Sequence, residues 1–229
     1  MMATWWWLIA VGLAYLIGSI PFGVLIARSK GVDIRSVGSG NIGATNVGRT
    51  LGRQFGVICF VLDVLKGAAP VLAAGLTFGT LTERPGEIDV LEMGLWLGVA
   101  VAAVVGHMAS IFLGFAGGKG VATGFGAILA MWPLLTVPAL AALATWFLVM
   151  KTSRYVSVAS MAAAASLPAW CIAWLAIWSE ESAGAALSGG WPPIVALAAL
   201  AGLIIWRHRG NIARLRRGEE AKVGEPDPK

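Results

Sequence analysis

Glycines and small polar residues crowd one segment of the sequence, GSGNIGATNVGR, which runs from Gly38 to Arg49. Glycines let successive backbone N–H groups point at one anion, and a guanidinium can bind two phosphate oxygens at once. The segment therefore predicts a phosphate-binding loop, whereas a flexible loop between helices is the plainer alternative. The candidate ligands in this first loop are Ser39, Gly40, Asn41, Thr45, Asn46 and Arg49.

A second glycine cluster surrounds a lysine in the sequence Gly117-Gly118-Lys119-Gly120, which we call the lysine loop. If a helix begins near Val121, its free N–H groups and positive end would face a phosphate together with the ammonium of Lys119. The alternative is a glycine turn with a lysine that only sets membrane orientation. His107 precedes this loop, and a lone histidine near the end of a span is more often packed than catalytic.

Two nucleotide-binding signatures resemble parts of these loops but do not fit. The first loop contains G-x-G-x-x-G, yet it follows a long apolar segment, and no βαβ unit surrounds it. The lysine loop lacks the spacing G-x-x-x-x-G-K-[ST], because Leu113 stands five residues before Gly118 and Gly120 follows the lysine. Rossmann-type binding and Walker-type hydrolysis are therefore both disfavoured.

The third polar cluster is the basic sequence RHRGNIARLRRGEE, from Arg207 to Glu220. Its members His208, Asn211 and Arg214 recur every three residues and would share one face of a helix. The surrounding arginines could instead be anchors that set membrane orientation. Glu219 could bond back to these arginines or simply be solvated.

One charged pair, Asp63 and Lys66, lies inside an otherwise apolar segment. Charges within a membrane span are costly, so they indicate either a function or a partner. A self-contained ion pair that secures helix packing and a direct contact of Lys66 with substrate are both consistent with the spacing. Before the carboxyl-terminal tail, the predicted cytoplasmic side has only Asp33 and Asp63 as aspartates, so we expect neither a metal nor another cofactor.

These clusters interrupt a chain that must lie in a membrane. It has 229 residues, of which 58% are hydrophobic and 13% charged. Several segments are long enough to cross a hydrocarbon core of about 30 Å. We predict one all-α transmembrane domain over residues 1–206 and a basic cytoplasmic tail over 207–229. The apolar segments are Trp5 to Ala27, Phe55 to Leu81, Met93 to Phe115, Val121 to Met150, Tyr155 to Trp178 and Trp191 to Trp206.

The segment from Val121 to Met150 is too long for one ordinary span, and charge resolves its path. If it turns back near Pro133 or Pro138, only Arg84 of the 17 basic residues lies outside, and Glu180 and Glu181 lie outside as well. The turn can join two short tilted helices or a re-entrant pair. The sequence therefore predicts seven spans in the inner membrane, with the amino terminus outside and the tail and all three polar clusters on the cytoplasmic side.

In this order, the segments resemble the bacterial acyl-phosphate-dependent glycerol-3-phosphate 1-acyltransferases over nearly the whole chain. The first loop, DVLKG from Asp63 to Gly67, GH…GGKGVAT and RHRGNIARLRRGEE are similar to four signatures of that family. The family usually has Phe-Pro after the histidine and a lysine before the paired glycines, where this chain has Met108-Ala109 and Ala116. The resemblance implies a seven-helix membrane fold with a cytoplasmic active site.

The resemblance also implies roles for single residues. Ser39, Arg49, His208 and Asn211 would serve activity, residues 117–120 would bind acyl phosphate, and Glu219 would maintain structural integrity. Asp63 and His107 are interpreted as structural. The partners would be acyl phosphate, glycerol 3-phosphate, membrane lipids and the soluble enzyme that makes acyl phosphate, with no nucleic acid.

A transporter of phosphate or of a phosphorylated small molecule is the alternative from another class. Transporters tend to bind their substrate near the middle of the membrane, between inverted repeats. Here the predicted loops share one face and no inverted halves are apparent, so the sequence favours the acyltransferase.

Overall fold

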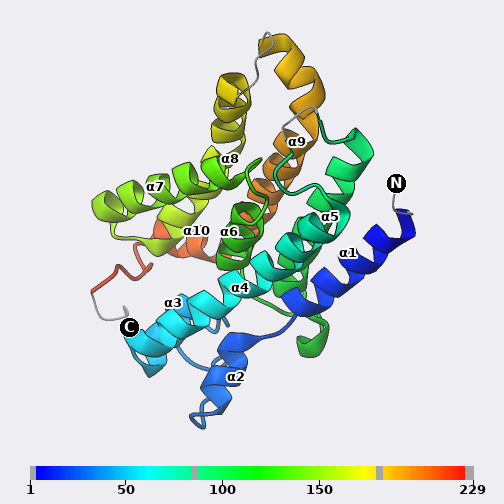
Figure 1. Ribbon diagram of the computed structural model, residues 1–229. Coiled ribbons are helices and arrows are strands. Elements are labelled where there is room, and N and C mark those ends of the chain that lie inside the picture. Colours follow the sequence, from blue (N-terminus) through cyan, green and yellow to red (C-terminus); the bar gives the residue numbers. More distant parts are fainter. Residues whose placement is uncertain (1–3, 84–86, 179–182, 225–229) are drawn as a thin grey trace. The chain divides into compact units, whose positions relative to one another are not determined.

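Helices make up all the regular structure of the residues described by the computed structural model, which are 4–83, 87–178 and 183–224, with only the backbone described for 183–189. The all-α prediction is confirmed for this part of the chain. Five residues of the loops that we predict to lie outside the membrane are not among the described residues: Arg84, Gly86, Glu180, Glu181 and Ser182. In chain order (Figure 1), the helices are α1 (Thr4–Gly18), α2 (Phe22–Arg28), α3 (Ala44–Leu51), α4 (Arg53–Phe78), α5 (Val90–Met108), η1 (Ile111–Leu113), α6 (Val121–Leu129), α7 (Thr136–Ser153), α8 (Val156–Trp178), α9 (Ala183–Arg207) and α10 (Arg209–Arg217).

Six helical segments among the described residues are long and apolar enough to cross a bilayer. Large apolar side chains such as Leu8, Leu76 and Leu148 are exposed on them, as expected for surfaces that face lipid rather than water. The segments are Thr4–Arg28, Arg53–Phe78, Val90–Leu113, Thr136–Ser153, Val156–Trp178 and Gly190–Arg207.

The predicted turn within residues 121–150 is confirmed. Helix α6 ends at Leu129 and α7 begins at Thr136, so Pro133 lies in the turn, whereas Pro138 lies in the first turn of α7. Helix α6 has 9 residues and rises only about 13 Å, which is too short to cross a bilayer alone. The count of seven spans therefore stays a prediction.

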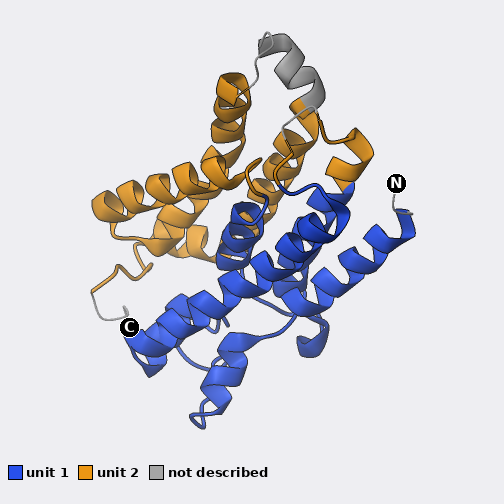
Figure 2. Cartoon of the chain, in the orientation of Figure 1, with its two compact units in different colours: residues 1–81, 95–131 blue, residues 82–94, 132–229 orange. Residues whose placement is uncertain are grey.

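Two compact units divide the chain and are shown in different colours in Figure 2. Unit 1 comprises residues 1–81 and 95–131, and it contains the first loop, the Asp63–Lys66 pair and the lysine loop. Unit 2 comprises residues 82–94 and 132–229, and it contains α7 to α10.

Helix packing in unit 1 depends on close approaches of backbone. A side chain at Gly67 of α4 would collide with the carbonyl of Thr123, and one at Gly126 of α6 would collide with the carbonyl of Val64. Helices α4 and α6 therefore lie in direct contact along the stretch that carries Asp63 and Lys66. Elsewhere in unit 1, the buried Ser110 hydroxyl donates to the Ser19 carbonyl at 2.6 Å.

Unit 2 is built on the sequential packing of α7, α8 and α9. Two indole N–H groups link α7 and α8: Trp146 donates to the Ser160 hydroxyl at 3.2 Å, and Trp170 donates to the Thr145 hydroxyl at 3.1 Å. Indole donors are satisfied in this way while their apolar rings pack between helices. Helix α10 leaves the end of α9 after a break at His208.

Candidate functional site

The side chain of Asn46 organises the first loop, which joins α2 to α3. Its Oδ1 accepts a hydrogen bond from the Ser39 N–H at 3.0 Å. Its Nδ2 donates to the carbonyls of Ile34, Val37 and Asn41 at 3.2, 3.1 and 2.9 Å. Only 2% of Asn46 is exposed. One buried amide thus holds together a stretch of loop that has no regular structure of its own.

The path of the loop also explains a glycine next to Ser39. Gly38 has a φ of +56°, a conformation that side-chain-bearing residues rarely adopt. A side chain there would also collide with Asn46 Oδ1. Gly38 therefore lets the backbone pass over the Asn46 amide and leaves Ser39 exposed at the turn.

The other predicted ligands of the first loop are more exposed than Asn46. Thr45 and Arg49 are exposed on α3, and Gly40 and Asn41 are half-buried. The Asn41 Oδ1 accepts a hydrogen bond from the Gly43 N–H at 2.9 Å, which supports the start of α3. The loop can therefore present its serine, threonine and arginine side chains to a ligand, while Asn46 faces inward.

An apolar cluster anchors the first loop to the neighbouring helices. It joins α2, the loop, α3 and α4, and Leu113 of η1 packs against it. Because η1 leads into the lysine loop, this contact links the supports of the two predicted phosphate-binding segments within unit 1. The buried members of the cluster are Val24, Ala27, Ile34, Ile42, Val47 and Cys59.

The lysine loop lies against the end of α5. The Gly118 N–H donates to the His107 carbonyl at 3.0 Å. Gly118 and Gly120 are buried, whereas Gly117 and Lys119 are half-buried. Helix α6 begins directly after the loop, with Gly120 as its N-cap residue and no side-chain cap. The predicted helix start at Val121 is confirmed, and the binding of an anion by this N-terminus and Lys119 stays a prediction.

The intramembrane pair Asp63–Lys66 is formed within α4. Lys66 Nζ lies 2.7 Å from Asp63 Oδ1, and it also donates to the Ile20 carbonyl at 2.7 Å. The two side chains are only 2% and 3% exposed. This geometry favours the packing interpretation for Lys66; its predicted contact with substrate stays a prediction.

Predicted tail residues meet at a glutamate in unit 2. Asn211 Nδ2 donates to Glu220 Oε1 at 2.6 Å, and Arg214 Nε donates to Glu220 Oε2 at 2.8 Å. The Ser157 hydroxyl of α8 donates to Oε1 of the same carboxylate at 2.6 Å. Glu220 therefore attaches α10 to α8. The predicted common face is confirmed for Asn211 and Arg214, whereas His208 precedes α10 as its N-cap residue.

His208 lies at the break between α9 and α10, with 2% of the residue exposed. Its Nδ1 is 2.8 Å from the Ile204 carbonyl. A carbonyl oxygen can only accept, so Nδ1 carries the hydrogen, and in a neutral ring Nε2 then carries the lone pair. This tautomer is the one that a proton acceptor at Nε2 needs.

Sequence reasoning missed Glu220 and selected its neighbour. Glu219 pairs with Arg217 at 2.7 Å on an exposed surface, with 51% of its side chain accessible against 9% for Glu220. The implied structural role of Glu219 stays a prediction, but the geometry favours Glu220 for it. Gly218 ends α10 with a φ of +71°, so helical periodicity could not indicate which glutamate turns inward.

The bonds to Glu220 predict how stability depends on pH. Burial raises the pKa of this carboxyl, but hydrogen bonds from Ser157, Asn211 and Arg214 outweigh burial and hold the pKa below its usual value. A lowered folded-state pKa contributes stability that is complete above the unfolded value of about 4.3. The contribution disappears as pH falls through the folded-state pKa.

We expect Glu220→Gln to lower the free energy of unfolding by about 1.5 to 3 kcal/mol at pH 7, because charge-assisted bonds are lost. The difference from wild type should begin to shrink below about pH 4.3, where the unfolded carboxyl becomes protonated, and should disappear once the folded-state carboxyl is protonated as well. Thermal unfolding in detergent across pH is the measurement, with Glu219→Gln as the matched control. Equal destabilisation by both variants would contradict the role of Glu220.

The structure thus brings the predicted residues together as two groups. The first loop, the Asp63–Lys66 pair, His107 and the lysine loop belong to unit 1, and His208, Asn211 and Arg214 belong to unit 2. The meeting of both groups at one site stays a prediction.

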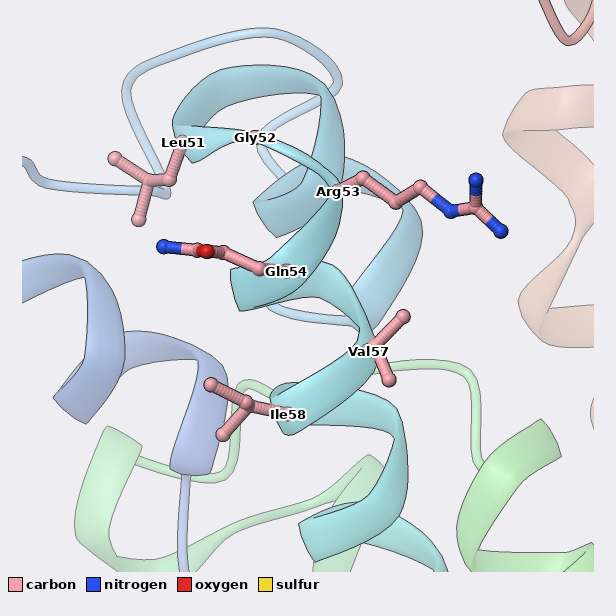
Figure 3. A pocket seen from close by; sticks show the side chains of 6 residues that line it. All are labelled: Leu51, Gly52, Arg53, Gln54, Val57 and Ile58. Carbon is pink, nitrogen blue, oxygen red and sulfur yellow. The ribbon is translucent and has the colours of Figure 1, made fainter.

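A separate hollow of about 730 Å³ lies beside the junction of α3 and α4. In Figure 3, Leu51, Gln54 and Ile58 project to one side of the helix, and Arg53 and Val57 project to the other. The hollow is lined by residues 51–54, 57 and 58, and none of the predicted site residues is among them. We therefore assign the candidate site to the loops.

Comparison with known proteins agrees with this arrangement of motifs. Residues 8–218 match the family model for glycerol-3-phosphate acyltransferase. A relative with that name from Desulforamulus reducens is 43% identical over 213 residues, which are 93% of this chain and 92% of the relative. One from Geobacter sulfurreducens is 43% identical over 215 residues, which are 93% of this chain and 95% of the relative.

Two solved structures are also similar to this chain. One is the glycerol 3-phosphate form of PlsY, an integral membrane glycerol 3-phosphate acyltransferase, with a TM-score of 0.78 and 39% identity over 95% of this chain and 96% of that chain. The other is its lysophosphatidic acid form, with a TM-score of 0.75 and 38% identity over 95% of each chain.

Proposed function

Because this chain belongs to the glycerol-3-phosphate acyltransferase family, we propose that it moves a fatty acyl chain from acyl phosphate to the 1-hydroxyl of glycerol 3-phosphate. The products are lysophosphatidate and inorganic phosphate. The observation that carries this proposal is the first loop, in which a buried Asn46 leaves Ser39 and Arg49 exposed to bind a phosphate. The solved relatives are in glycerol 3-phosphate and lysophosphatidic acid forms, which correspond to the acceptor and the product.

Acyl phosphate is a mixed anhydride with a good leaving group. The acceptor hydroxyl attacks the acyl carbon, the bond from that carbon to the phosphate oxygen breaks, and phosphate departs. Such a reaction needs positioning and stabilisation of charge more than a covalent enzyme intermediate. In our proposal, Lys119 and the amides of the lysine loop hold the phosphoryl group, while Arg49 and Ser39 bind glycerol 3-phosphate.

Two groups can accept the proton of the attacking hydroxyl. One is His208 Nε2, whose lone pair is consistent with the Nδ1 bond to the Ile204 carbonyl. The other is a substrate phosphate, whose second pKa lies near 6 as in other phosphomonoesters. Neither route needs a metal or an organic cofactor.

Turnover by purified protein tests the proposal against the transporter alternative. In detergent, with no compartments, the enzyme should make lysophosphatidate from acyl phosphate and glycerol 3-phosphate. A soluble thioester donor, acyl coenzyme A, should not replace acyl phosphate. Absence of product with all substrates present would refute the proposed reaction. Formation of lysophosphatidate with acyl coenzyme A as the sole acyl donor would refute the requirement for acyl phosphate.

Direct transfer makes a further prediction about the donor half of the reaction. Ser39 has no histidine or carboxylate beside it in sequence to activate it as a nucleophile. We therefore expect incubation with acyl phosphate alone to leave the protein unacylated. Intact-protein mass spectrometry is the measurement. An acyl adduct on Ser39 that glycerol 3-phosphate then discharges would establish a covalent route instead.

For the membrane arrangement, we propose seven spans in the bacterial inner membrane, with the amino terminus outside and the active site on the cytoplasmic side. Charge asymmetry supports this orientation, and the turn between α6 and α7 allows the chain to reverse direction within residues 121–150. A cytoplasmic site would also give the soluble enzyme that makes acyl phosphate direct access.

Cysteine labelling in intact cells tests this topology. Single cysteines at Ser36, Ser153 and Gly218 should be protected from an impermeant reagent, and those at Gly86 and Ser182 should react from outside. Lysing the cells should expose the protected set, which controls for side-chain burial. Labelling of position 153 from outside would contradict the double crossing.

A further inference from the structure

A buried polar connection runs from the middle of α4 to the lysine loop. It begins at Asp63 and Lys66, which are one helical turn apart. Lys66 lies within 2.7 Å of Asp63 Oδ1, and its ammonium lies 5.6 Å from the centre of the Phe22 ring. It also donates to the Ile20 carbonyl at the break between α1 and α2. Lys66 is therefore held by three neighbours inside the membrane domain.

His107 continues this connection from the last turn of α5. Its Nδ1 lies 3.7 Å from Asp63 Oδ1, and 5% of its side chain is exposed. Asp63 Oδ1 thus has both an ammonium and an imidazole as neighbours, and both come from unit 1. A buried carboxylate with two such neighbours restricts the position of the ring.

The opposite edge of the imidazole ring lies against the lysine loop. A side chain at Gly118 would collide with His107 Nε2. The backbone of His107 also accepts the Gly118 N–H at 3.0 Å. The ring and the carbonyl of one residue therefore both contact the residue that precedes Lys119.

We propose that His107, fixed by Asp63 and Lys66, is a positioning residue that sets the conformation of the lysine loop and hence the place of Lys119. The inference rests on the proposed function, because it gives Lys119 the task of holding the donor phosphate. In this arrangement His107 touches the loop and not the reacting atoms. The buried charges of α4 thereby act on catalysis through the loop.

The two loop glycines provide a matched pair of variants. Gly118→Ala would place a methyl group against the His107 ring, which a smaller side chain at position 107 can relieve. Gly117→Ala would place a methyl group against the backbone of His107 and Met108, which no substitution at position 107 removes. The pair separates a ring contact from a general intolerance of the loop to side chains.

The test is a double-mutant cycle of His107→Ala with each glycine variant. Gly118→Ala alone and His107→Ala alone should each lower kcat/KM for acyl phosphate by about tenfold, and the double variant should lose no more than either single variant. For Gly117→Ala combined with His107→Ala, the two losses should multiply. Strictly multiplicative losses for Gly118→Ala with His107→Ala, or unchanged activity of His107→Ala alone, would overturn the inference.

A second readout does not depend on activity. Trypsin cleavage after Lys119 in detergent, followed by peptide mass spectrometry, reports the conformation of the loop. Cleavage should be faster than wild type in Gly118→Ala and in His107→Ala, and it should be no faster in the double variant. If wild type makes no lysophosphatidate, the proposed function fails, but trypsin cleavage of the same variants still tests the contact between the His107 ring and Gly118. His107→Asn, which is shorter and keeps a donor toward Asp63, replaces His107→Ala if that variant does not purify.

Discussion

Replacing Lys119 by alanine is expected to lower kcat/KM for acyl phosphate by about 10- to 150-fold, because a charge-assisted hydrogen bond contributes about 1.5 to 3 kcal/mol. The loss should appear mainly as a higher KM for the donor if Lys119 only binds phosphate. It should extend to kcat if the ammonium stabilises the departing charge in the transition state. Steady-state kinetics with each substrate varied in turn separates the two.

Arg49→Ala should show the complementary pattern, with a raised KM for glycerol 3-phosphate and a smaller effect on the donor. Arg49 lies on α3 and Lys119 precedes α6, so the two cations come from different segments of unit 1. Lys151→Ala is the control, since it removes a lysine from the exposed end of α7. Near-wild-type kinetics for both Lys119→Ala and Arg49→Ala would refute the assignment of phosphate binding to the two loops.

The fold could be predicted where composition or charge decides it. Apolar segments of sufficient length predicted the spans, and charge asymmetry predicted the turn that the structure places around Pro133. Glycine density located the loops. All of these features are local in sequence, so residue spacing and composition are sufficient to predict them.

The direction in which a polar side chain points could not be predicted. Asn46 and Ser39 both looked like ligands, but Asn46 turns inward because the carbonyls of Ile34 and Val37, far back in the loop, need donors. The sequence left Lys66 as either a packing residue or a substrate contact, because its bond to the Ile20 carbonyl joins α4 to the distant segment between α1 and α2. Such partners are distant in sequence and have no periodic signal.

The inward direction of Asn46 also gives the sharpest test of the first loop. Asn46→Asp keeps an acceptor for the Ser39 N–H but turns the Nδ2 donor into an oxygen that faces three carbonyls. Leaving buried acceptors unpaired costs about 1 to 3 kcal/mol. We therefore expect a lower midpoint of thermal unfolding. We also expect kcat/KM for glycerol 3-phosphate to fall by about 100-fold, as small displacements of positioning groups do.

Asn41→Asp is the matched control, because it adds the same negative charge to the same loop. The Asn41 Oδ1 acts as an acceptor for the Gly43 N–H, and a carboxylate keeps that bond. Its thermal stability should therefore stay close to wild type even if its added charge weakens phosphate binding. Asn46→Ala completes the set, since it loses the bonds without adding charge and should still lose stability. If Asn46→Asp instead unfolds like wild type and changes only the KM for glycerol 3-phosphate, Asn46 is a substrate ligand, and another group must hold Ser39 in place.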